Sequence, residues 1–166
     1  GREAREYIKK ARLRVARFLG AHSDEIVFTS SGTESNNLAI QGVASNFSRL
    51  LRQGREFSTE SGQLSKPHII TTQIEHLSVL EPIRWLGKNG FDVSYLPVDR
   101  EGFINLEELR KTLRPETVLV SVMYANNEIG TIQPIPKISK IISSFRSTKH
   151  EARNPKPSYI KTTDGT

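Results

Sequence analysis

The amino-acid sequence predicts an α/β protein in which a mostly parallel sheet lies between two layers of helices, a three-layer α/β/α arrangement. Short β-rich runs alternate along the chain with segments of helical periodicity, which is typical of this fold class. The run Val118–Met123 is almost continuously apolar, as in a strand that is buried on both faces. At 166 residues, with 36% hydrophobic and 25% charged residues, the chain has the size and composition of one soluble domain.

The first part of the chain reads as helix, strand, loop and helix. Apolar residues recur with helical period over residues 4–19, and Gly20 follows them as a glycine follows a helix. The run Glu25–Thr29 has the composition of a short buried strand. A polar loop, Ser30–Asn37, leads from it into a helical pattern over residues 38–47.

The second part of the chain alternates strands and helices. Asn105 is placed to cap one of these helices, and Gly90 closes another. Strands are predicted at His68–Thr72, Phe91–Pro97, Val118–Met123 and Ser158–Asp164, and helices at 77–86, 106–113 and 137–145. Residues 48–66 have no sustained period and are expected to form a surface loop insertion, and residues 146–157 a loop before the last strand.

In an open parallel sheet, ligands bind beyond the carboxyl ends of the strands. The loops after Thr29, Thr72, Met123 and Thr163 are therefore expected to converge on one site. The first of them holds glycine and hydroxyl residues where a strand passes into a helix, which is a candidate phosphate cradle. The alternative is that its hydroxyl residues only cap the helix. The chain has neither a dinucleotide fingerprint nor a P-loop motif.

The other three loops carry further candidate residues. Glu75 and His76 follow one strand, Asn126 and Asn127 follow the most buried strand, and Asp164 ends the last one. Polar groups at such positions must be hydrogen-bonded to protein or ligand.

Several classes of chemistry are excluded or disfavoured. The sequence has no cysteine, so it contains no disulfide, no thiolate metal ligand and no cysteine nucleophile. The four histidines show no metal-ligand spacing, and no G-x-S-x-G motif is present. The longest apolar runs are far shorter than the roughly 18 residues of a membrane span.

The formal net charge of +6 raises the alternative of a basic nucleic-acid-binding domain. However, residues 1–20 hold seven Lys or Arg against two Glu, and residues 146–161 hold five against one. The rest of the chain is slightly acidic. The basic residues therefore lie away from the candidate site and are expected to be solvated surface, so nucleic acid stays a remote alternative.

Three motifs together resemble a known family. The segments Phe28–Leu38, Ile74–His76 and Ala125–Gly130, in this order and spacing, are similar to those of the cysteine desulfurase and selenocysteine lyase family of fold-type-I pyridoxal phosphate enzymes, in the aminotransferase class V group. The insertion at 48–66 and the connection at 146–157 look more like selenocysteine lyases.

The resemblance implies roles for five residues in binding pyridoxal 5'-phosphate. Gly32 and Thr33 would contact the phosphate, His76 would stack on the pyridine ring in a supporting role, and Asn127 would hydrogen-bond on the ring or substrate side. Asp164 would keep the pyridine nitrogen protonated, so that the ring accepts the electrons of the departing α-proton.

The chain also departs from the family pattern. Thr162 and Gly165 stand where the family has His and Ala, and neither the Schiff-base lysine motif nor the mobile-loop cysteine is present. We therefore expect residues 1–166 to be one partial domain, a fragment of the large cofactor-binding domain that is inactive alone, with no catalytic residue of its own. A non-catalytic relative, serving as a cofactor-binding or dimerisation module, is the alternative.

For the whole protein, the resemblance implies removal of sulfur or selenium from L-cysteine or L-selenocysteine, which leaves L-alanine. It further implies a homodimer and a sulfur or selenium acceptor protein, with no nucleic-acid or membrane partner. Cytoplasm is the expected location, with the mitochondrion as the alternative.

Overall fold

The computed structural model of the chain describes residues 1–52 and 65–150. By its internal contacts the chain divides into two compact units, Gly1–Ser31 and Gly32–Thr166. None of the helices in these described ranges is both long enough and apolar enough to cross a membrane.

The first unit contains helix α1 (Arg2–Leu19) and a short 3-10 turn, η1 (Ser23–Glu25). Gly20 ends α1 in the left-handed conformation, with φ 64°, which confirms the predicted terminating glycine. The predicted strand Glu25–Thr29 is wrong. Its backbone is extended at Ile26, but no described strand pairs with it, and a strand exists only through hydrogen bonds to a neighbour.

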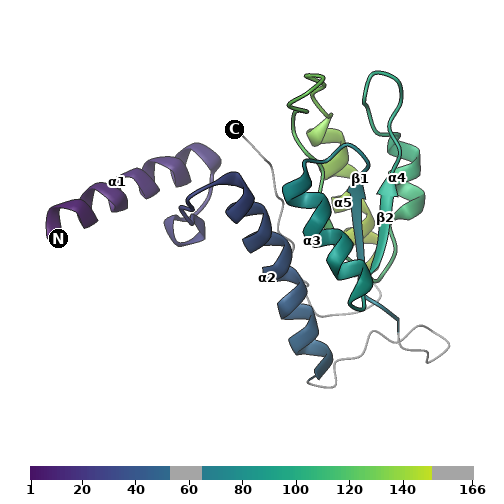
Figure 1. Cartoon of the computed structure of the whole chain (residues 1–166), viewed down its shortest axis with the longest axis horizontal. Coiled ribbons are helices and arrows are strands. Elements are labelled where there is room, and N and C mark those ends of the chain that lie inside the picture. Colours follow the sequence, from purple (N-terminus) through teal and green to yellow (C-terminus); the bar gives the residue numbers. More distant parts are fainter. Residues whose placement is uncertain (53–64, 151–166) are drawn as a thin grey trace. The chain divides into compact units, whose positions relative to one another are not determined.

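The second unit is built on three parallel strands (Figure 1). Strand β1 (His68–Thr72) lies between β2 (Asp92–Leu96) and β3 (Thr117–Val120). It pairs with β2 along its whole length, and its pairing with β3 has an irregularity just after its first residue. All five residues of β1 are buried, as expected for a central strand of a parallel sheet.

Helices cover both faces of this sheet. They are α2 (Gly32–Arg52), α3 (Leu77–Lys88), α4 (Leu106–Thr112) and α5 (Ile135–His150). Two separate apolar clusters show which helices belong to which face. Ile69 of β1 belongs to one cluster and its neighbour Ile70 to the other, because successive side chains of a strand point to opposite faces.

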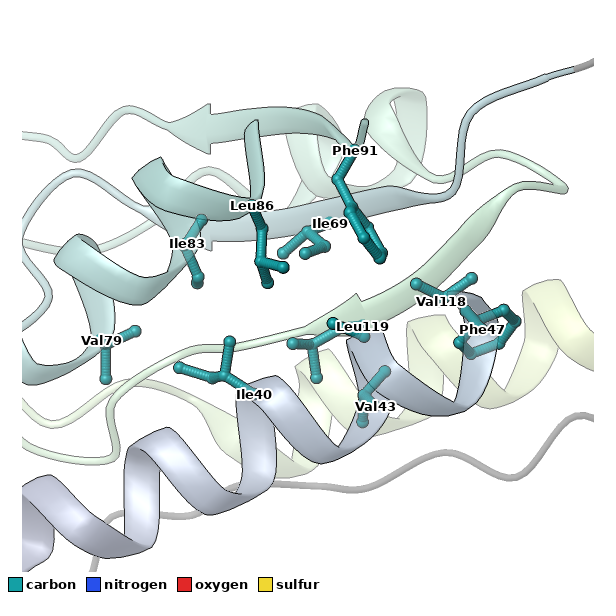
Figure 2. Packing of buried hydrophobic residues seen from close by; sticks show 11 residues of the cluster. Ile40, Val43, Phe47, Ile69, Val79, Ile83, Leu86, Phe91, Val118 and Leu119 are labelled. Carbon is teal, nitrogen blue, oxygen red and sulfur yellow. The ribbon is translucent and has the colours of Figure 1, made fainter. Parts of the chain in front are cut away.

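The cluster on the first face joins α2 and α3 to the sheet (Figure 2). Its members are Ile40, Val43, Ala44, Phe47, Ile69, Val79, Ile83, Leu86, Phe91, Val118 and Leu119.

The cluster on the second face joins α4 and α5 to the sheet. Its members are Ile70, Leu96, Ile104, Leu109, Leu113, Val122, Ile138 and Ile141. Helix, sheet and helix thus form three layers, which confirms the predicted fold class.

Helix α2 begins earlier than its apolar pattern predicts. The predicted polar loop Ser30–Asn37 is wrong from Gly32 onward, where the chain is already helical. The polar side chains of these first turns bond along the helix itself, as when Asn37 Nδ2 donates to the Thr33 carbonyl at 2.9 Å. A polar composition is therefore typical of the exposed first turns of a helix as well as of a loop.

Strand β3 ends earlier than the prediction Val118–Met123. The Ser121 N–H still donates to the Ile70 carbonyl at 2.8 Å, but the Met123 N–H donates to a Glu75 side chain. After Ser121 the backbone therefore stops pairing with β1, and the Met123 N–H bonds to the Glu75 carboxylate instead. The other predicted strands, His68–Thr72 and Phe91–Pro97, are confirmed as β1 and β2.

Two connections differ in part from their predicted form. Helix α2 continues through Arg52 and α5 through His150, so the predicted connections 48–66 and 146–157 both begin as helix. Residues 53–64 and 151–157 lie outside the described residues, as does the predicted strand Ser158–Asp164.

A buried histidine at the start of β1 bonds to side chains of both neighbouring strands. His68 of β1 is 1% exposed, and its Nδ1 lies 2.9 Å from Thr117 Oγ1 of β3. Its Nε2 lies 2.9 Å from Ser94 Oγ of β2. Burial, assisted by the charge of Arg114 and opposed by Asp92, lowers the pKa of His68 to about 4. The ring is therefore a neutral structural group at pH 7.

This burial predicts a loss of stability in mild acid. The unfolded chain takes up a proton on His68 near the ordinary pKa of 6.5, whereas the folded chain resists protonation down to about 4. The stability that His68 contributes is therefore complete above pH 6.5 and is lost as the pH falls toward 4, by about 2 kcal/mol between pH 7 and 5. Urea unfolding of the full-length protein across this range measures it. His68→Gln, which cannot titrate, should show a shallower slope, and an equal slope would contradict the assignment.

Candidate functional site

The carboxyl ends of β1 and β3 are tied to each other by buried side chains. Glu75, three residues after β1, is 5% exposed. Its Oε1 accepts from the Thr72 hydroxyl at 3.0 Å and from the Met123 N–H at 2.7 Å. One carboxylate therefore holds the end of β1 against the chain that follows β3.

Asn126 makes a second tie between the same two loops. Its Oδ1 accepts from the N–H groups of Glu128 and Ile129, at 2.8 and 3.0 Å, which shapes the turn after β3. Its Nδ2 donates to the Ile74 carbonyl at 3.0 Å. Asn126 is buried, whereas its neighbour Asn127 is exposed. The first amide of the pair thus builds the loop and leaves the second available to a ligand.

Gln133 supports the same loop from its other end. This side chain is 2% exposed, and its Nε2 donates to the Gly102 carbonyl at 2.6 Å while its Oε1 accepts from the Ile104 N–H at 3.3 Å. Gly102 has φ +86°, and a Cβ there would stand 2.5 Å from Ile129 Cδ1. Any other residue at position 102 would strain this left-handed backbone, and its Cβ would push the Ile129 side chain aside.

His76 is the N-cap of α3, and its side chain is exposed. The Ser78 N–H donates to its Nδ1 at 3.1 Å, and Ser78 Oγ lies 2.8 Å from the same nitrogen. The ring is thus held at one edge by the first turn of the helix that it caps.

The start of α2 lies beside this histidine. Asn36, in the second turn of α2, donates from Nδ2 to Ser78 Oγ at 2.9 Å. Gly32 and Thr33 form the first turn of α2 and are exposed. A Cβ added at Gly32 would meet no heavy atom within 4 Å, so the space beside this helix end is open. The N-terminus of a long helix, the His76 ring and the β1 loop therefore form one neighbourhood.

The structure places four of the five predicted cofactor-binding residues among its described residues. Gly32 and Thr33 are linked to His76 through Asn36 and Ser78, and the loop bearing Asn127 is linked to the loop bearing His76. Asp164 lies outside the described residues, as does the loop after Thr163.

The positioning side chains around these residues were not all apparent from the pattern of the sequence. In the sequence, Ser78 and Asn36 are ordinary polar residues of two helices. Only the hydrogen bond between them, which joins residues 42 positions apart, shows their role. One signal was present for Ser78, since it stands among the apolar residues Leu77, Val79 and Leu80 in the first turn of α3.

The donors of this site suit an anionic group and a flat ring. The N-terminal end of α2 carries the positive end of the helix dipole, which favours a phosphate. The imidazole of His76 offers a flat face, and the Asn127 amide offers both a donor and an acceptor. In the described ranges no three His, Asp, Glu or Cys residues are grouped as metal ligands are.

Comparison with known proteins gives consistent matches. A family model described as aminotransferase class V matches residues 1–147. Cysteine desulfurase IscS of Dictyoglomus turgidum is 51% identical over 145 residues, which are 87% of this chain and 33% of that protein. The mitochondrial cysteine desulfurase of Arthroderma benhamiae is 47% identical over 150 residues, which are 90% of this chain and 27% of that protein.

A solved structure of a NifS-like protein is 44% identical to the chain. It superimposes with a TM-score of 0.72 over 86% of this chain and 35% of its own length. The chain therefore spans about a third, or less, of the length of these relatives.

Proposed function

Because this chain belongs to the class-V aminotransferase family, whose cofactor is pyridoxal phosphate, we propose that it is part of a cysteine desulfurase. Such an enzyme removes the sulfur of L-cysteine and leaves L-alanine. The observation that carries the proposal is the meeting of the α2 N-terminus with the His76 ring, in a chain that is 51% identical to a cysteine desulfurase over 87% of its length.

The residues of the site fit the two main parts of this cofactor. In the proposal, Gly32 and Thr33 bind the phosphate at the positive end of α2. His76 packs on the pyridine ring, Asn127 hydrogen-bonds at the ring or the substrate carboxylate, and Asp164 holds a proton on the pyridine nitrogen. When bound, the cofactor supplies an electron sink for the Cα–H bond of the amino acid.

The buried side chains of the site act by holding these groups in place. Glu75 and Asn126 fix the β1 and β3 loops to each other, so His76 and Asn127 keep a constant separation. A site that is held rigidly before the substrate arrives spends less binding energy on ordering itself.

Other parts of the reaction need the family's Schiff-base lysine motif and a cysteine, and the 166 positions contain neither. We infer a lysine that carries the cofactor and a cysteine that accepts the sulfur atom as a persulfide, both supplied by the rest of the protein, and onward transfer to an acceptor protein. L-selenocysteine is the alternative substrate, favoured by the long 48–66 segment. We further infer a homodimer, located in the cytoplasm or, as for the Arthroderma relative, in the mitochondrion.

Reconstitution of the full-length protein tests the proposal. With pyridoxal phosphate it should develop a visible absorbance band, and with L-cysteine it should form alanine and persulfide in equal amounts. A parallel assay with L-selenocysteine decides between the two substrates. Absence of both the band and alanine would support a non-catalytic relative instead.

Replacing His76 with Ala should lower kcat/KM by about ten-fold or more, because the ring contact with the cofactor is lost. Steady-state kinetics on the full-length enzyme measures this effect. Lys88→Ala, an exposed position at the other end of α3, is the matched control and should leave kcat/KM unchanged. Equal kinetics for the two variants would remove His76 from the site.

A further inference from the structure

Among the described residues, the His76 ring is hydrogen-bonded at Nδ1 alone, by Ser78, which is bonded in turn to Asn36. We propose that Ser78 and Asn36 are positioning residues that hold this ring in one orientation and keep the proton on its other nitrogen, Nε2. The orientation and tautomer of the ring follow from these hydrogen bonds. Their consequence for a cofactor rests on the proposed function.

The backbone of α3 requires Nδ1 to be an acceptor. The first N–H groups of a helix have no partner within the helix, and a side chain at the N-cap satisfies them by accepting. His76 does so with Nδ1, which lies 3.1 Å from the Ser78 nitrogen. A backbone N–H can only donate, so Nδ1 must present its lone pair.

The Ser78 hydroxyl adds a second bond of the same direction. Asn36 Nδ2, which can only donate, lies 2.9 Å from Ser78 Oγ, so this oxygen accepts from Asn36. The single hydroxyl hydrogen of Ser78 is then available to His76 Nδ1, 2.8 Å away. Asn36 is 7% exposed and Ser78 9%, so water competes little for these bonds.

Two consequences follow for the ring. A neutral imidazole has one donor and one acceptor nitrogen, so a ring whose Nδ1 accepts carries its hydrogen on Nε2. Rotation of the ring about its bond to Cβ would break both bonds to Nδ1, so one orientation is favoured. Under the proposed function, His76 meets the cofactor ring with a fixed plane and with an N–H at its free edge.

The same bonds connect the ring to the helix that binds the phosphate. Asn36 follows Gly32 by four residues on α2, which is about one turn. A chain of donors thus runs from α2 through Ser78 to His76. A change at Asn36 or Ser78 should therefore alter the ring without touching the phosphate donors.

The tautomer of His76 in the full-length protein tests the proposal directly. Long-range 1H–15N spectra of the cofactor-free protein with 15N-labelled histidine, at about pH 8.5 where imidazole is neutral, report which nitrogen carries the hydrogen. In the unaltered protein His76 should be almost entirely in the Nε2–H form. Ser78→Ala should raise its Nδ1–H population roughly five-fold, the equivalent of one hydrogen bond. Ser78→Thr, which keeps the hydroxyl, should restore the original spectrum.

The controls separate this role from a general effect of losing a hydroxyl. Ser147→Ala, which removes an exposed hydroxyl of α5, should leave the His76 signals unchanged. Asn36→Asp tests the same chain from its other end, since a carboxylate would draw the Ser78 hydrogen away from Nδ1 and change the tautomer as Ser78→Ala does. This second variant decides the matter if Ser78→Ala fails to fold. A tautomer population that neither variant alters would overturn the proposal.

A second measurement separates this inference from the proposed function. In the cofactor-loaded protein, Ser78→Ala should weaken pyridoxal phosphate binding roughly five-fold and shift its visible absorbance maximum, and Ser78→Thr should not. If the unaltered protein binds no pyridoxal phosphate, the proposed function fails and the tautomer result stands. If it binds the cofactor but Ser78→Ala leaves the tautomer unchanged, only the positioning role fails.

Discussion

Replacing Glu75 with Ala should destabilise the protein by about 2–4 kcal/mol. The substitution removes the acceptor of both the Thr72 hydroxyl and the Met123 N–H. Both donors are buried, because Thr72 is 0% exposed and Met123 is 5% exposed. A buried donor left without an acceptor costs about 1–3 kcal/mol. The free energy of unfolding of the full-length protein in urea measures the loss.

Glu75→Gln is the matched control for this change. A glutamine keeps a carbonyl oxygen that can accept both bonds, so it should lose less than half as much stability as the alanine variant. Glu75→Ala should also weaken pyridoxal phosphate binding, because the loops that bear His76 and Asn127 are no longer held together. An alanine variant as stable as the unaltered protein would show that this carboxylate does not join the two loops.

Replacing Ile83 with Ala should destabilise the protein by about 2–5 kcal/mol. Ile83 of α3 is 0% exposed and packs in the cluster that joins α2 and α3 to the sheet (Figure 2). Loss of buried methyl and methylene groups removes transfer free energy and leaves a cavity whose walls relax only in part. Urea or thermal unfolding of the full-length protein measures the effect.

The conservative variant at the same site calibrates this prediction. Ile83→Val removes one methylene-sized group and should cost about 0.5–1.5 kcal/mol. The two variants together give a graded series at one position. If both leave the free energy of unfolding unchanged, the contact between α3 and the sheet is weaker than the burial of Ile83 indicates.

Local pattern predicted most of the second unit of the fold. Strand β1 was predicted with its observed bounds, and α4 was predicted with Asn105 as its cap, whose Oδ1 accepts from the Glu107 N–H at 2.9 Å. Periodicity and capping act within a few residues, so the sequence displays them directly. Where the pattern misled, as at Glu25–Thr29, the element depends on a distant partner strand that local sequence does not specify.

The three motifs Phe28–Leu38, Ile74–His76 and Ala125–Gly130 are sufficient to indicate the family and the candidate residues. The match of a class-V aminotransferase model over residues 1–147 confirms that family. The individual roles of Gly32, Thr33, His76 and Asn127 stay predictions, and Asp164 lies outside the described residues.

The sequence alone therefore determined the fold class, the order of most elements and the family, because these depend on residue types at short spacings. Only the tertiary structure showed that Glu75 joins the ends of β1 and β3, and that Asn36 reaches His76 through Ser78. The Glu75–Met123 and Asn36–Ser78 bonds join residues 48 and 42 positions apart. Their geometry follows from how the helices and strands pack, and no local pattern of residues records it.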